Sequence, residues 1–179
     1  MLKTPYLDRI VSRETLKKIE KYCDFLIKYN KKLNLISKST ENIIMSRHIE
    51  DSSQLLKYIN SEDKNILDIG SGAGFPGIVM YIVKNDLNLD FKLDIVEKSS
   101  KKCTYLQELC KFLEIDVVIH NHDVKNLEKK NYTTLVSRAF KPLDSFLHIL
   151  DMSNIKFNKI LLLKGQSYNT ELTEAEKHW

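Results

Sequence analysis

The chain has 179 residues, 42% hydrophobic and 29% charged, which is typical of one soluble globular domain with a single core. Its apolar runs are too short to span a bilayer and Met1–Pro5 lacks an apolar signal region, so a cytoplasmic protein without a membrane span is expected. The net charge of +4 mildly favours a polyanionic partner, although this lysine-rich composition alone supports nucleic-acid binding only weakly.

The first 60 residues are predicted to form a helical cap. Ser12 is a candidate N-cap of a first helix, because apolar residues then recur at three- and four-residue steps. Thr40 is a candidate N-cap of a second helix that runs to Ile59. The apolar positions of the first helix are Leu16, Ile19, Cys23, Leu26 and Leu33.

From residue 61 onward, short β-branched runs alternate with helical stretches. Such near-continuous apolar strands, separated by helices, predict an open, doubly wound, mostly parallel α/β sheet covered on both faces. Residues 61–179 are expected to form this domain and to make one compact unit with the cap. The predicted strands are 66–69, 93–96, 117–120, 133–137 and 160–163, and the predicted helices are 77–84, 99–113, 143–150 and 169–178.

The three cysteines form no Cys-x-x-Cys pair, which argues against a disulfide framework and against a zinc site. Cys103 and Cys110 are two helical turns apart, so both can face the core. The sequence shows no cluster of metal ligands, and no metal is expected.

A glycine loop follows the first predicted strand, in the segment Asp68-Ile-Gly-Ser-Gly-Ala-Gly-Phe-Pro-Gly77. Glycines permit positive φ and let a nucleotide approach the backbone closely. A dinucleotide fingerprint would require glycine where Phe75 stands, and no Gly-Lys-Ser/Thr closes a P-loop. The segment instead resembles motif I of class I methyltransferases, which bind S-adenosylmethionine.

Two further strand ends carry acidic side chains that suit a nucleoside. Glu97 ends the second predicted strand, where a carboxylate can accept hydrogen bonds from both ribose hydroxyls. Asp123 follows the third strand and can either contact an adenine or cap a turn.

Four segments together resemble one family, the bacterial small-subunit ribosomal RNA methyltransferases called RsmG or glucose-inhibited division protein B. Motif I alone would indicate only the superfamily, whereas the other three segments are more particular. The resemblance covers about residues 15 to 170. The segments are Asn34-Leu-Ile with Arg47-His-Ile-Glu-Asp-Ser52, Asp68 to Gly77, Val136-Ser-Arg-Ala-Phe140, and Leu163-Lys-Gly165.

The resemblance implies the class I methyltransferase fold and transfer of a methyl group from S-adenosylmethionine to the 7-nitrogen of a guanine in 16S ribosomal RNA. A monomer is expected. Arg138 and Lys164 would serve catalysis, although Arg138 can also be a structural ion pair and His48 can brace the cap. The implied cofactor-binding residues are Gly70, Ser71, Gly72, Gly74, Phe75, Glu97, Asp123, Val124, Lys125 and Arg138, and the implied RNA contacts are Arg47, His48, Lys98, Lys101, Lys102 and Lys164.

The implied chemistry asks little of the side chains. Guanine N7 carries a free lone pair, so it can attack the methyl group without a general base, and positioning would supply the rate. Two alternatives stay open, a ribosomal RNA-binding or assembly factor without activity and a nicotinamide-dependent oxidoreductase. Members of the family that the chain resembles continue into two further strands, so two expectations stay open: either the last strands of the sheet are missing here, or something else covers the edge of the fifth strand.

Overall fold

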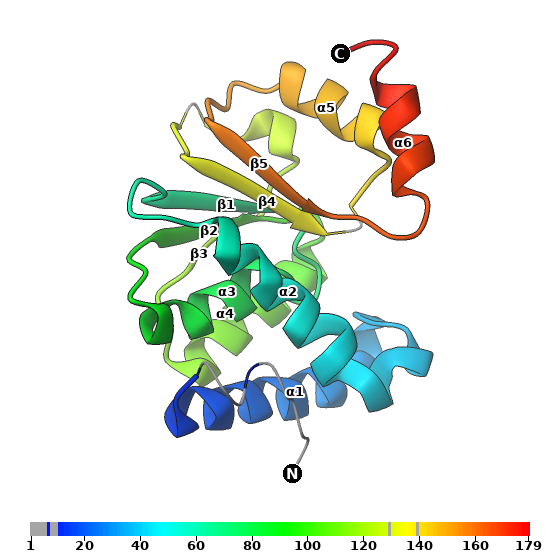
Figure 1. The fold of residues 1–179 in the computed structure, drawn as a ribbon. Coiled ribbons are helices and arrows are strands. Elements are labelled where there is room, and N and C mark those ends of the chain that lie inside the picture. The colour runs from blue at the N-terminus through cyan, green and yellow to red at the C-terminus, as the bar shows by residue number, and fades with distance from the viewer. Residues whose placement is uncertain (1–6, 8–10, 129, 139) are drawn as a thin grey trace.

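The computed structural model describes residues 7, 11–128, 130–138 and 140–179. Ala139 of the Ser-Arg-Ala segment and the Met1–Pro5 terminus lie outside the described residues. A five-stranded sheet forms the centre of the molecule, in the order β3-β2-β1-β4-β5 with all pairings parallel (Figure 1). The strands are β1 (Asn65–Ile69), β2 (Lys92–Val96), β3 (Val118–His120), β4 (Thr134–Arg138) and β5 (Lys159–Leu163).

Helices cover both faces of this sheet, which confirms the doubly wound α/β prediction. On β1, Ile66 belongs to the core under α3 (Gly77–Val83) and α4 (Ser100–Leu113), whereas Leu67 belongs to the core under α5 (Leu143–Asp151). The chain order reverses between β1 and β4, so a crevice is expected outside the carboxyl ends of these two strands.

The cap begins with α1 (Arg13–Leu33), which packs across α3 and α4 (Figure 1). Ser12 is its N-cap, as predicted, and the serine hydroxyl oxygen accepts a hydrogen bond from the Thr15 amide at 3.2 Å. The helix buries one apolar stripe with residues Ile19, Tyr22, Cys23 and Leu26.

The second predicted helix is wrong in its start and in its regularity. It begins after Ser37 rather than at Thr40, whose hydroxyl donates to the Ser37 carbonyl inside the first turn. It then runs as short pieces, because the hydroxyls of Ser52 and Ser53 bond carbonyls of the preceding turn and compete with the helical pattern. The pieces are η2 (Lys38–Ile43), η3 (Met45–Glu50, a π-helix), α2 (Asp51–Ser53) and η4 (Gln54–Tyr58).

The last helix and strand lie at the β5 edge of the sheet, and two short helical turns lie elsewhere. The last helix, α6 (Tyr168–Ala175), packs against α5, and β5 pairs with β4 alone among the described residues (Figure 1). Short η5 (Lys84–Leu87) and η6 (Val124–Asn126) follow α3 and β3.

The three cysteines are buried, as expected for core residues. Within the described ranges, no helix is long and apolar enough to cross a membrane.

Candidate functional site at the carboxyl ends of the strands

The glycine loop after β1 adopts a conformation that side chains rarely reach. Gly70, Gly72 and Gly74 have φ of 72°, 59° and 105°. A Cβ atom at Gly70 would also lie 2.2 Å from the ring of Phe140, the second residue after β4. Glycine at position 70 therefore allows a close approach between the loops that follow β1 and β4.

Asp68 holds the glycine loop from beneath. One carboxylate oxygen accepts hydrogen bonds from the Ser71 hydroxyl at 2.6 Å and from the Gly77 amide, where α3 begins, at 2.8 Å. The other oxygen is buried without a partner among the described residues. Burial raises the pKa of Asp68 to about 7, with a further contribution from the nearby charge of Glu97. The loop thus rests on a carboxyl group that titrates near neutral pH.

The cap also holds this loop. The hydroxyls of Tyr22 on α1 and Tyr105 on α4 both donate to the carbonyl of Ala73, at 2.8 and 3.1 Å. The Phe75 ring packs against the rings of Tyr22 and His48, with centroid distances of 5.6 and 5.0 Å. The structure therefore places Phe75 in the contact between the loop and the cap.

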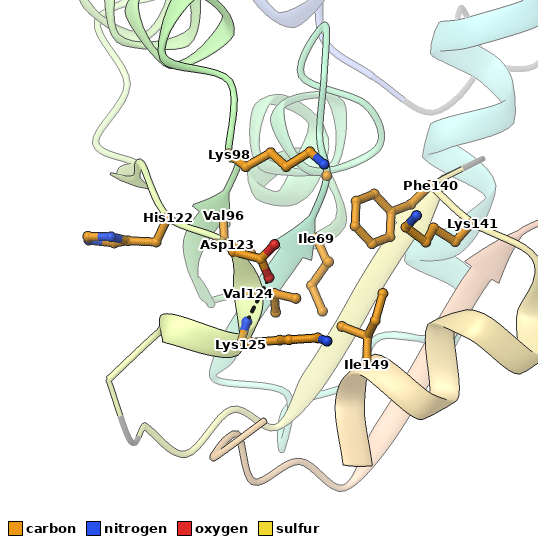
Figure 2. A pocket seen from close by; sticks show the side chains of 11 residues that line it. Ile69, Val96, Lys98, His122, Asp123, Val124, Lys125, Phe140, Lys141 and Ile149 are labelled. Carbon is orange, nitrogen blue, oxygen red and sulfur yellow. Dashed lines mark hydrogen bonds between the residues drawn. The ribbon is translucent and has the colours of Figure 1, made fainter. Parts of the chain in front are cut away.

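A cavity of about 200 Å³ opens beside Gly70, at the carboxyl ends of β1 and β2 (Figure 2). Figure 2 shows the side chains of Val124, Phe140 and Ile149 around it, whereas His122 points away. The walls combine apolar side chains with charged and polar ones. The lining residues are Ile69, Gly70, Val96, Lys98, His122, Asp123, Val124, Lys125, Phe140, Lys141 and Ile149.

Four of the predicted cofactor-binding residues line this cavity, namely Gly70, Asp123, Val124 and Lys125. The turn-capping alternative for Asp123 also holds, since its carboxylate accepts a hydrogen bond from the Lys125 amide at 3.1 Å (Figure 2). Lys98, predicted as an RNA contact, stands at the same cavity.

Glu97 joins the loops after β1 and β2 instead of lining the cavity. Its carboxylate accepts hydrogen bonds from the Gly72 amide at 3.3 Å and from the Ser99 amide at 2.9 Å. Gly72, Gly74 and Ser71 lie in the loop but not in the cavity wall.

Arg138, at the end of β4, reaches the cap. Its guanidinium donates to the backbone carbonyl of Arg47 at 2.7 Å, approaches that of His48 at 3.5 Å, and lies 3.6 Å from the Asp51 carboxylate. It also stands 5.6 Å from the centre of the Phe75 ring. The structural ion pair considered for Arg138 is thus present, and it ties β4 to the irregular cap segment.

His48 shares this environment and is unsuited to carry a charge there. Burial is the main cause that lowers its pKa to about 4, and the positive charges of Arg138 and Arg47 add to the effect. The neutral ring stacks on Phe75 with 9° between the planes and bonds the Thr40 hydroxyl at 3.0 Å. These contacts brace the cap, as one interpretation of His48 had it.

Most of the remaining predicted RNA contacts are exposed to solvent, whereas Lys164 is bonded to other residues of the chain. Arg47, Lys98 and Lys101 are exposed and Lys102 is partly so. Lys164 is engaged, because its ammonium group lies 2.8 Å from the Glu171 carboxylate and donates to the Lys141 carbonyl at 2.5 Å.

Sequence reasoning missed several cavity residues, of which Phe140 is the most informative. The rule that ligands bind beyond strand ends would have indicated it, because it follows β4 directly after the Ser-Arg-Ala segment. No sequence signal pointed to Ile149 on α5, which reaches the cavity through packing.

Comparisons with known proteins show which sequences and folds this chain resembles. The sequence pattern of the family described as "rRNA small subunit methyltransferase G" matches residues 15–179. A "Ribosomal RNA small subunit methyltransferase G" of Rickettsia felis is 36% identical over 169 residues, covering 94% of this chain and 84% of the relative. That of Rickettsia prowazekii is also 36% identical, covering 94% of this chain and 85% of the relative.

Solved structures share the fold at low identity. The ribosomal protein L11 methylase from Lactobacillus delbrueckii subsp. bulgaricus has a TM-score of 0.56 at 11% identity, covering 73% of this chain and 66% of that protein. A precorrin-6y C5,15-methyltransferase from Geobacter metallireducens has a TM-score of 0.50 at 15% identity, covering 71% and 68%. The fold is therefore that of the class I S-adenosylmethionine-dependent methyltransferases.

Proposed function

The chain belongs to the rRNA small subunit methyltransferase G family, and from this premise we propose that it transfers a methyl group from S-adenosylmethionine to N7 of a guanine in 16S ribosomal RNA. The observation that carries the proposal is the cavity between Gly70 and the loop after β3, at the carboxyl ends of the strands. Its place beside the switch between β1 and β4 is where parallel α/β sheets bind nucleosides.

The residues present fit S-adenosylmethionine. The apolar side chains of the lining, Val96, Val124 and Ile149, suit an adenine ring, and the segment of Val124 and Lys125 would border it. Gly70 would let the amino-acid part of the cofactor approach the backbone, where a side chain would block it. The cofactor would supply an electrophilic methyl group on a sulfonium.

The proposed transfer needs no proton acceptor. When bound, the cofactor would offer its methyl group to the N7 lone pair, and the carbon–nitrogen bond would form as the carbon–sulfur bond breaks, with the positive charge moving from the sulfonium to the guanine. The task of the chain is to align the two reactants and exclude water, and such alignment can lower a barrier by roughly 7–11 kcal/mol. Neither Cys103 nor Cys110 is placed to act as a nucleophile, since both are buried in α4.

Arg138 and the basic residues divide the remaining work in this proposal. Arg138 would hold the cap against the loops that border the cofactor, through the carbonyls of Arg47 and His48. Lys98 and Lys101, exposed near the carboxyl edge, would meet RNA phosphates.

The test is methyl transfer from labelled S-adenosylmethionine to bacterial small ribosomal subunits that lack the modification, with the product mapped by nuclease digestion and mass spectrometry. We expect label as 7-methylguanosine at one position. Cofactor binding without transfer would instead support the inactive RNA-binding alternative, and binding of a nicotinamide cofactor in place of S-adenosylmethionine would overturn the assignment.

A further inference from the structure

Lys164 lies at the centre of a polar network that ends on the loop after β4. Its ammonium group is paired with the Glu171 carboxylate of α6 and donates to the carbonyl of Lys141. The same Glu171 oxygen accepts the amide hydrogen of Leu143, the first residue of α5, at 2.9 Å. The loop between β4 and α5 is therefore fastened at Lys141 and at Leu143.

The fastened loop carries the residue that closes one side of the cofactor cavity. Phe140 precedes Lys141, and its ring lies so close to Gly70 that no Cβ atom fits between them. The ring also packs edge-on against Phe146 of α5, with a centroid distance of 6.2 Å. Phe140 and Lys141 both line the cavity (Figure 2). A shift of this loop would change the cavity wall directly.

We propose that Lys164 and Glu171 are positioning residues that set the Phe140 wall of the cofactor cavity through the Lys141 carbonyl and the Leu143 amide. This inference rests on the proposed function, because it assigns the cavity to the cofactor. It gives the Leu163-Lys-Gly165 segment a task inside the protein, on the loop that faces the cofactor.

The geometry favours this task over a phosphate contact for Lys164. Its side chain is only 16% exposed, and that of Glu171 is 20% exposed. The hydrogen bond from Lys164 is the first cause that lowers the pKa of Glu171, so the carboxylate neutralises the ammonium group at neutral pH. A phosphate would have to displace a charged partner that is already in place.

The experiment compares Lys164→Met and Glu171→Ala with the wild-type chain. If both residues position the loop, each variant weakens S-adenosylmethionine binding by about tenfold or more and lowers kcat by about 10²-fold, as small misplacements do. The affinity for ribosomal RNA stays within about twofold. Lys164→Arg keeps the charge and the donors and restores most of the lost kcat.

Glu174→Ala is the matched control, because Glu174 lies on the same helix and pairs with Lys177 at the exposed surface. It is expected to behave like the wild-type chain. Unchanged cofactor binding with weaker RNA binding in Lys164→Met, and normal behaviour of Glu171→Ala, would overturn the inference in favour of a phosphate contact.

Hydrogen exchange separates this inference from the proposed function. The Leu143 amide donates to Glu171, so the peptide spanning 140–147 should exchange faster in Glu171→Ala, with or without cofactor. A wild-type chain that binds no S-adenosylmethionine would contradict the proposed function while faster exchange still established the anchoring. Unchanged exchange in this variant would overturn the anchoring itself.

Discussion

Gly70 and Gly72 share a left-handed backbone in one loop, yet a side chain would meet different surroundings at each. At Gly70 the nearest atom to a Cβ is a Phe140 ring carbon at 2.2 Å, whereas at Gly72 it is a backbone oxygen at 3.9 Å. Both positions carry the strain that a left-handed conformation imposes on a side chain, roughly 1–2 kcal/mol. Only Gly70 adds a steric conflict with the cavity wall.

Gly70→Ala is therefore expected to lower the free energy of unfolding by more than the matched Gly72→Ala, which should cost only about 1–2 kcal/mol. In a chain that already carries Phe140→Ala, the further change Gly70→Ala should cost less, because the ring that the new Cβ would meet is gone. Urea unfolding of the wild-type chain, the three single variants and the double variant measures these values. Equal losses of unfolding free energy in Gly70→Ala and Gly72→Ala would mean that the Phe140 ring moves aside at little cost.

Arg138→Ala removes the charged donor that serves the carbonyls of Arg47 and His48, and hydrogen bonds to a charged group contribute about 1.5–3 kcal/mol to stability. Methyl transfer is expected to fall by about 10²-fold or more, because the cap and the glycine loop both lose their contacts with Arg138. Steady-state kinetics and urea unfolding measure the two effects. Near-normal turnover by a folded variant would remove Arg138 from the site.

The control for Arg138 is Arg47→Ala. The Arg47 guanidinium is exposed and lies 3.9 Å from the Asp51 carboxylate, so its loss should change the unfolding free energy by only about 0.5 kcal/mol. A large loss of stability at Arg47 would show that the ion pairs, rather than the carbonyl contacts of Arg138, hold the cap.

At single positions, the sequence indicated backbone conformation better than side-chain contacts. The alternate glycines predicted a tight loop, and their positive φ confirms it. The resemblance predicts Phe75 as a cofactor contact, whereas no sequence pattern indicates that its ring packs against Tyr22 and His48, which lie far away in sequence. Such packing depends on how the cap docks, and no local pattern encodes it.

At the scale of single elements, strand β2 contains a buried carboxylate. Asp94 accepts hydrogen bonds from His120 at 2.8 Å, Lys130 at 2.5 Å and Tyr132 at 2.9 Å. Burial opposes its ionisation, but these three partners outweigh burial and lower its pKa to about 2. The cluster ties β2 to β3 and to the segment before β4.

The depressed pKa of Asp94 predicts a specific acid sensitivity. Its ionised form stabilises the fold above pH 4, and this contribution, at most about 2 kcal/mol, is lost as the pH falls from about 4 to about 2. Asp94→Asn should flatten the unfolding free energy across this window and lower it at neutral pH. Urea unfolding between pH 2 and 7 measures both effects.

Asp90→Asn provides the comparison, because the Asp90 side chain is 90% exposed and pairs only loosely with Lys64 at 3.3 Å. Its stability at neutral pH should match the wild-type chain within about 0.5 kcal/mol. A variant at Asp94 that kept the wild-type pH dependence would place the acid sensitivity elsewhere.

Element types were predicted well where periodicity was strong and poorly where it was not. All five strands lie where the short β-branched runs predicted them, and the long helices α1 and α4 also lie within a residue or so of their predicted bounds. From Lys38 to Tyr58 the structure has short helical pieces in place of one regular helix, with a serine hydroxyl bonded to a carbonyl of the preceding turn and Arg138 reaching the segment from β4. The spacing of apolar residues in the sequence does not reveal these hydroxyl and arginine contacts.

At the scale of the whole molecule, the proposed RNA surface depends on where the basic charge lies. Lys98 and Lys101 follow the carboxyl end of β2, whereas Lys92 begins β2 at the opposite edge of the sheet and Lys111 lies in the last turn of α4. All four side chains are exposed. Substituting Lys98 and Lys101, or Lys92 and Lys111, therefore removes the same number of positive charges from two different places on the molecule.

The double variant Lys98→Gln/Lys101→Gln should weaken binding to ribosomal RNA and reduce the slope of log affinity against log salt by about 1–2, one unit or less for each lost phosphate contact. Lys92→Gln/Lys111→Gln should leave both quantities close to those of the wild-type chain. Filter binding across a series of salt concentrations measures them. Equal effects of the two double variants would indicate a diffuse attraction without a defined surface.

The fold as a whole followed from the order of strands and helices, since parallel strands with crossover helices allow few arrangements. The same rule predicted the carboxyl ends of the strands as the place of the candidate site, where the structure has a cavity. The loop that carries Phe140 did not, because its anchorage at Glu171 joins β5, α5 and α6 across an interval of about thirty residues.

The two tyrosine hydroxyls on Ala73 bear on how this protein can be inherited and engineered. A domain boundary at residue 60 would separate Tyr22 from the glycine loop, whose Ala73 carbonyl accepts the Tyr22 hydrogen bond. The cap therefore cannot be exchanged as an independent module. A cap grafted from a relative would have to bring its own match for Ala73 and Phe75. Changes in the cap and in the glycine loop should therefore arise together, and recombination between them should favour breakpoints elsewhere in the chain.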